Sequence, residues 1–172
     1  MKKIKITLII VLIGLFTIPN FFDELSNNGT LYGANDFTQV VNTPTEIKTI
    51  METACFDCHS NQTNYMWYSG IAPLSLILNH DIEEGKHELN FSEFKTYKAK
   101  RQKHKLEEIA EQVESHEMPM TAYTWTHPQA KLTDDQRTLL INWAKAAMEE
   151  INLADTTVKV ETKEVSVKEP RH

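Results

Sequence analysis

Both cysteines of this 172-residue chain lie in the stretch CFDCHS at residues 55–60, and a histidine directly follows the second cysteine. The spacing Cys55-x-x-Cys58-His59 is the attachment pattern of c-type haem. Each thiol can add across one vinyl group of the porphyrin, and one helical turn separates the sulfurs by about the distance between those groups. The imidazole of His59 then lies under the macrocycle, where it can bind the iron. The pattern therefore predicts one covalent haem c, attached through Cys55 and Cys58 and ligated by His59.

Other uses of two cysteines fit this chain less well. A structural zinc site needs four ligands, whereas this chain offers two cysteines, with His59 immediately beside the second. A thioredoxin-like pair belongs in a βαβ setting, but the apolar periodicity of this chain is helical. A disulfide between residues so close in sequence would be strained. Haem attachment is therefore the preferred interpretation.

Iron that is bound by His59 has a sixth coordination position, and the stretch HEMPMTAYTWTH offers sulfur for it. Thioether sulfur at that position raises the reduction potential, while a second imidazole lowers it. Met118 is the preferred ligand and Met120 the alternative, and Pro119 between them can stiffen a ligand loop. Among the other histidines, His80 is the strongest candidate, either as a ligand or as a residue that orients a propionate or a loop.

Helices are predicted to position these residues. Thr43 can cap a helix whose first residue is Pro44, and its apolar face leads to the cysteine motif at its end. A second helix is predicted to open at Pro73 and to close at Gly85.

Two further helices are predicted in the second half of the chain. One runs from about Ser92 to Ser115, with a potential break near Lys100, and is followed by a long loop over 116–132, which is the kind of loop that often carries function. The last begins at a capping box, TDDQ, and ends near Leu153. The fold class is therefore all-α, a small cytochrome c-like helical domain around one covalent haem.

The first 22 residues, MKKIKITLIIVLIGLFTIPNFF, combine three early lysines with an apolar run. This layout is that of an export segment. No small-x-small cleavage pattern follows, which favours an uncleaved N-terminal membrane helix over 1–22. Because the lysines remain cytoplasmic, the rest of the chain is expected on the periplasmic side of the inner membrane, and a cleaved periplasmic form is the alternative.

The remaining chain divides into three parts. Residues 23–42 are polar and predict a tether, residues 43–153 form the haem-binding domain, and residues 154–172 predict a flexible C-terminal tail. The net charge of -6 and the pI near 5.6 argue against nucleic acid as a partner, because general nucleic-acid binding needs a basic surface.

Four stretches are distinctive in combination: CFDCHSNQT, WYSGIAPLSLILNHDIEEGKHELNFSEF, EMPM and HPQAKLTDDQ. Through them the chain resembles a family of exported c-type cytochromes known as haem-binding domain proteins, common in Bacteroidetes-like bacteria. The resemblance implies a single covalent haem, a helical cytochrome c-like fold and an N-terminal membrane segment. It also implies Cys55 and Cys58 as thioether sites and His59 as the proximal ligand. Its MP-containing loop matches Met118, and Met120 stands where many relatives have a second proline.

The preferred function is one-electron transfer by a membrane-tethered monohaem cytochrome, which is not an enzyme and acts with redox partner proteins. Six-coordinate iron has no open position, so the protein contributes ligand choice, burial and haem placement. The alternatives are a peroxidase-like enzyme or a redox- or gas-sensing module, both of which require an open sixth position.

Two finer expectations concern the walls of the haem site. The carbonyl of Pro73 is expected to accept a hydrogen bond from Nδ1 of His59 and so to set the tautomer. Four residues that follow the motif are expected to wall the haem: Trp67, Tyr68, Ile71 and Leu74.

Overall fold

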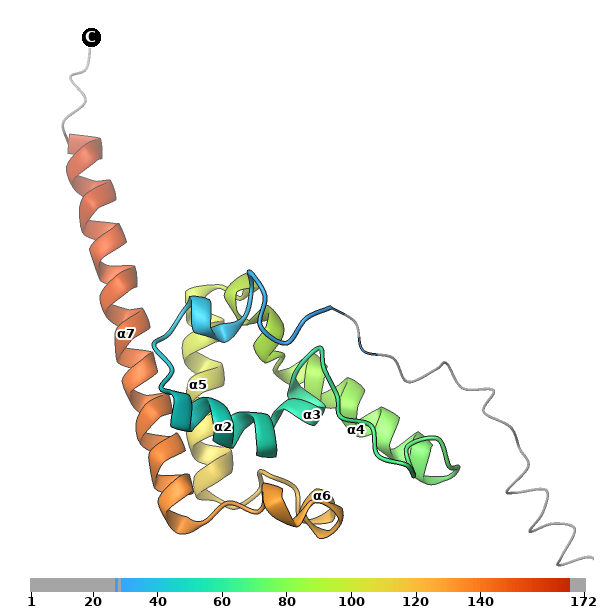
Figure 1. Ribbon diagram of the computed structural model, residues 1–172. Helices are drawn as coiled ribbons and strands as arrows, with labels where there is room; N and C mark the ends of the chain where they lie inside the picture. The colour runs from blue at the N-terminus through green and yellow to red at the C-terminus, as the bar shows by residue number, and fades with distance from the viewer. Residues whose placement is uncertain (1–26, 28, 168–172) are drawn as a thin grey trace, which may run out of the picture.

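The computed structural model describes the backbone of residues 27 and 29–167, and the side chains of this part as far as residue 154 (Figure 1). Every regular element in this part is a helix, so the all-α prediction is confirmed. The α-helices are α2 (Thr45–Ala54), α3 (Phe56–His59), α4 (Leu74–Glu88), α5 (Ala99–Glu114), α6 (Thr121–Thr126) and α7 (Asp134–Val167). The short 3-10 helices are η1 (Phe37–Gln39), η2 (Phe91–Thr96) and η3 (Pro128–Ala130).

Helices α5 and α7 lie side by side and form the main packed pair (Figure 1). They are antiparallel, since Arg137 near the start of α7 donates to the carbonyl of Val113 near the end of α5, at 2.8 Å. At the opposite end Lys103 donates to the side chain of Asn152, at 2.9 Å. Small and branched residues on the facing sides are buried and allow close approach; they are Leu106, Ala110 and Val113 of α5 and Leu140, Ala144 and Ala147 of α7.

Helix α7 begins at the capping box that the sequence predicted. The backbone N–H of Gln136 donates to the hydroxyl of Thr133 at 3.2 Å, and the side-chain carbonyl of Gln136 accepts from the N–H of Thr133 at 2.9 Å. The helix does not end near Leu153 but continues to Val167. No glycine or proline interrupts residues 134–167, so the backbone meets no helix-breaking residue there.

The segment that precedes α2 differs from the polar tether expected over 23–42. Asp36 caps η1 by accepting a hydrogen bond from the N–H of Thr38, at 2.8 Å. The ring of Phe37 is buried and makes edge contacts with Phe91 and Trp143. Phe37 and Val41 are therefore core residues, and their four-residue spacing within a polar stretch is the sequence signal that could have identified them.

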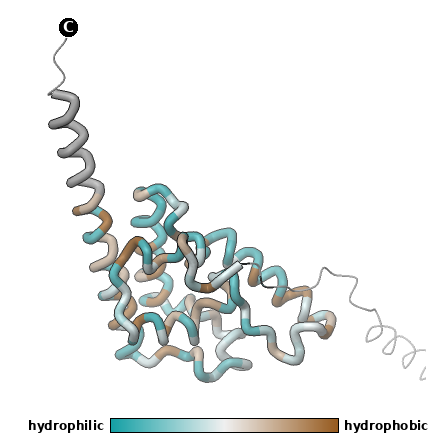
Figure 2. Tube along the Cα trace, turned by 45° about the horizontal axis from the view of Figure 1, so that its top comes forward, coloured by the Kyte–Doolittle hydropathy of each residue, from teal (hydrophilic) through white to brown (hydrophobic). Residues whose placement is uncertain are grey.

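The helices of the described part are mixed in character along their length, with hydrophilic and hydrophobic segments alternating (Figure 2). None of them has both the length and the apolar content that a bilayer crossing requires. The predicted membrane helix at 1–22 lies outside the described residues, as does the end of the predicted tail at 168–172.

Candidate functional site

The cysteine motif lies where α2 meets α3. Cys55 ends α2, with its N–H donating to the carbonyl of Met51 at 2.8 Å. The N–H of His59 donates back to the carbonyl of Cys55 at 3.0 Å, so the motif closes into one helical turn as predicted. Burial raises the pKa of the Cys55 thiol to about 12 and that of Cys58 to about 11. Thiols of such high pKa lack the thiolate character of redox-active cysteine pairs.

The imidazole of His59 is held by the C-terminal end of α4. Its Nδ1 lies 2.9 Å from the carbonyl oxygen of Gly85 and 3.0 Å from that of Leu89. Both partners are acceptors only, so Nδ1 carries the proton and donates, which leaves Nε2 with its lone pair free to bind a metal. Burial lowers the pKa of His59, which also favours the neutral ring.

The expected hydrogen bond from His59 to Pro73 is therefore wrong. Pro73 precedes the first residue of α4, whereas the accepting carbonyls belong to Gly85 and Leu89 at the end of the same helix. Gly85 lies twelve positions after Pro73, which is a distance of about 18 Å at 1.5 Å per residue of helix. The sequence suggested that a carbonyl would orient His59, but it could not place the correct end of α4 beside the motif.

The sequence predicted that Gly85 closes this helix, but α4 continues past it to Glu88. A Cβ atom at Gly85 would lie 2.7 Å from the carbonyl oxygen of Cys58 and 3.1 Å from its Cβ. Only glycine therefore allows α4 to approach the motif closely enough for the Gly85 carbonyl to reach His59.

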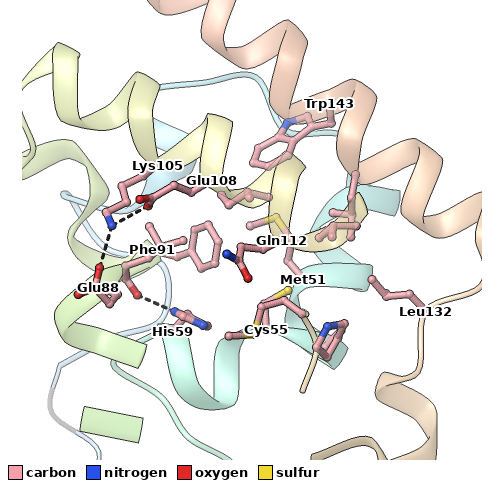
Figure 3. Close-up of a pocket in the computed structure, with 17 residues that line it drawn as sticks. Met51, Cys55, His59, Glu88, Phe91, Lys105, Glu108, Gln112, Leu132 and Trp143 are labelled. Atoms are coloured by element: carbon pink, nitrogen blue, oxygen red, sulfur yellow. Dashed lines mark hydrogen bonds and ion pairs between the residues drawn. The ribbon is translucent and has the colours of Figure 1, made fainter. Parts of the chain in front are cut away.

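Two adjoining cavities open beside the motif. The first has a volume of about 280 Å³ and the second about 170 Å³. Cys55, His59 and Met118 line both. The first cavity is walled largely by buried apolar side chains that come from all parts of the domain, as Figure 3 shows for Met51, Phe91, Leu132 and Trp143.

The other predicted site residues differ in which of the two cavities they line. Cys58, His80 and Met120 line only the second cavity. The backbone of Met118 is held on both sides, because its N–H donates to the carbonyl of Gln112 at 3.0 Å and its carbonyl accepts from Arg137 at 3.4 Å. Met118 is thus the methionine that faces the same space as His59 in both cavities.

The expected wall of four residues after the motif is not formed. Trp67 is 82% exposed and Leu74 is 51% exposed, and neither they nor Tyr68 and Ile71 line either cavity. The aromatic wall is supplied instead by Trp143 of α7 and Phe91 of η2. Short-range proximity in sequence misled here, because the segment over 60–73 leads away from the motif to the far end of α4, and that helix then returns toward the motif (Figure 1).

The segment over 116–132 contains α6 and η3 rather than one irregular loop. Tyr123 of α6 donates a hydrogen bond to Oδ2 of Asp57 at 2.8 Å, across 66 positions. Asp57 lies between the two cysteines, and its other carboxylate oxygen accepts from the N–H of Asn64 at 2.9 Å. The ring of Tyr123 stacks on buried His127 with centroids 4.1 Å apart. We call the Tyr123–Asp57 hydrogen bond the brace and residues 116–132 the methionine segment. The brace joins the methionine segment to the cysteine motif, and sequence reasoning missed it.

Burial, followed by the hydrogen bond to Asp57, raises the pKa of Tyr123 well above its ordinary value. The phenol therefore stays protonated and remains a donor across the ordinary pH range. Nothing in the local sequence pattern linked Tyr123 to Asp57, because the pair is created by tertiary packing.

Substitution of Gly85 by alanine is expected to destabilise the domain by about 1–3 kcal/mol, the usual cost of overpacking. The added methyl must push α4 away from Cys58, which also lengthens the bond to His59. Chemical denaturation followed by circular dichroism measures the effect. The matched control is Gly70→Ala, since a Cβ there meets nothing within 4 Å; equal stability of the two variants would contradict the packing role.

Substitution Tyr123→Phe is expected to lower the free energy of unfolding by about 1.5–3 kcal/mol, because it removes a hydrogen bond to a charged carboxylate. Tyr65→Phe is the control, as no hydrogen bond from that half-buried hydroxyl is found in the described part of the chain. A loss in Tyr123→Phe no larger than in Tyr65→Phe would show that the brace contributes nothing.

Comparison with known proteins identifies one family. A family model described as a haem-binding domain matches residues 10–146, which is most of the chain. No curated protein and no solved structure gives a significant match.

Proposed function

The chain belongs to the haem-binding domain family, and from this premise we propose that it is a membrane-tethered monohaem c-type cytochrome that carries single electrons. The observation that carries the proposal is the setting of His59. Its Nδ1 proton is committed to two backbone carbonyls, and its ring borders an apolar cavity within a C-x-x-C-H turn. A neutral imidazole with a free Nε2 is the form that binds iron.

The donor set of the site fits a haem. Two thiols and one imidazole lie on a single turn, and Met118, which carries a thioether, lines the same two cavities as Cys55 and His59. The first cavity offers apolar surface, which suits the body of a macrocycle and keeps water away from it. In the proposal Cys55 and Cys58 form the two thioether bonds, and His59 and Met118 hold the iron.

The chain's residues would tune a one-electron centre whose redox chemistry the haem iron supplies. The hydrogen bonds to Gly85 and Leu89 orient His59 and increase its basicity as a ligand. The backbone bonds of Met118 to Gln112 and Arg137 limit the movement of the loop. Thioether ligation together with apolar surroundings would raise the reduction potential, and iron held by both His59 and Met118 would favour electron transfer over catalysis.

The proposal extends to location and partners. The lysine-led apolar segment over 1–22 would anchor the protein in the inner membrane and leave the haem-binding domain on the periplasmic side. A domain tethered in this way would exchange electrons with other redox proteins at the membrane surface, and no nucleic acid or catalysed substrate is involved.

Covalent attachment is tested by expression of the full chain in a host that matures c-type cytochromes. Denatured protein is expected to retain the haem pigment and to show the added mass of one haem. Cys55→Ala/Cys58→Ala is expected to lose both, because no thiol remains for a thioether bond. Wild-type protein without pigment and without added mass would contradict the proposal.

The sixth ligand is tested by the ferric spectra of Met118→Ala and Met120→Ala beside the wild type. Loss of the weak long-wavelength charge-transfer band of methionine-ligated ferric haem is expected in Met118→Ala only, because Met120 borders just the second cavity. An intact band in both variants would exclude methionine ligation. High-spin ferric bands in the wild type would favour a peroxidase-like or sensing site with an open position.

A further inference from the structure

The first cavity is divided by polarity. Its interior side is formed by buried apolar residues, while Glu88, Lys105 and Glu108 gather on the opposite side, between α4 and α5, with Gln112 between this group and the apolar residues (Figure 3). Glu88 and Gln112 are exposed and Glu108 is half-exposed, so this side is the mouth of the cavity. A ligand with an apolar body and a polar edge would therefore enter with the polar edge at this mouth.

Lys105 is the only lysine or arginine that lines either cavity in the described part of the chain. Although it is charged, only 8% of it is exposed. Its ammonium group donates to Oε2 of Glu88 at 3.0 Å and to Oε2 of Glu108 at 2.7 Å, which fixes the group where α4 and α5 meet.

The ammonium group retains donor capacity. A lysine has three N–H donors, and the contacts of Lys105 within the described residues account for two of them. The two carboxylates already fix the position of the Lys105 ammonium group. A third acceptor would therefore bind it without a further loss of side-chain conformational entropy. The third N–H donor therefore belongs to Lys105, which lines the first cavity.

We propose that Lys105 is the binding site for a propionate carboxylate of the haem. This inference rests on the proposed function, because it assigns a residue to the polar edge of that same group. A carboxylate enclosed beside apolar walls needs a charged or hydrogen-bonding partner. Among the described residues, Lys105 is the one lysine or arginine that lines the cavity, and it would hold the propionate where α4 and α5 meet.

The proposal distinguishes Lys105 from the other lysines of α5. Lys103 lies two residues away, donates to the side chain of Asn152 and lines neither cavity. Replacement of either lysine by methionine removes the same charge from the same helix. Only the replacement of Lys105 should alter the haem propionate.

The experiment compares resonance Raman spectra of the purified, full-length haem-loaded proteins. In Lys105→Met the propionate bending band is expected to shift to lower frequency, because a hydrogen bond to the carboxylate is lost. The midpoint potential is expected to fall, since a positive charge that favours the reduced haem is removed. The propionate band of Lys103→Met is expected to match the wild type. An unshifted band in Lys105→Met, or an equal shift in Lys103→Met, would overturn the proposal.

Two further variants keep the test informative if Lys105→Met does not fold. Lys105→Arg retains a charged donor of different geometry and is expected to shift the band without abolishing haem loading. Glu108→Gln replaces a competing carboxylate by a neutral and weaker acceptor, so the ammonium should bind the propionate more strongly and the band should move to higher frequency. A band that is unchanged in both variants would refute the assignment. Wild-type protein that carries no haem would instead refute the proposed function, so the two failures are distinguishable.

Discussion

The hydrogen bonds from Nδ1 of His59 to the carbonyls of Gly85 and Leu89 are the constraint on which the site depends. They set the tautomer of the ring and leave Nε2 as the free nitrogen. They also require α4 to lie against the cysteine turn, at a distance that only a glycine at position 85 permits. The close approach of the α4 backbone at Gly85 to the cysteine turn therefore determines both the tautomer of the imidazole and the packing of α3 on α4.

The cavity beside His59 is assembled from segments that are far apart in the chain. Helices α5 and α7 supply Ile109, Val113, Leu140 and Trp143 to its apolar side, and their antiparallel packing brings Trp143 opposite the motif (Figure 3). The methionine segment is held at both of its ends, through Arg137 and Gln112 at Met118 and through Tyr123 at Asp57. A loop restrained in this way would lose little conformational freedom if Met118 bound iron as proposed.

Several elements could be predicted because their determinants are local. The capping box at Thr133 and the helical turn of the cysteine motif depend on residues within four positions of one another. Predictions that required a partner at long range did less well. The sequence pattern assigns Pro73 to His59 and Trp67 to the wall of the site because both follow the motif, yet both lie before the start of α4, whose opposite end contacts His59. Gly85 resembled a helix end because local patterns cannot distinguish an end from a close approach.

The sequence by itself determined the helical class, the donor atoms of the cysteine turn and the two methionines from which a sulfur ligand would come. These follow from residue type and spacing, which act over one or two helical turns. Tertiary structure alone decided which carbonyls orient His59, which methionine shares its cavities, and that Lys105 stands at the mouth. Such choices depend on contacts between helices many residues apart, and the geometry of those contacts arises only when the packed core brings the helices together.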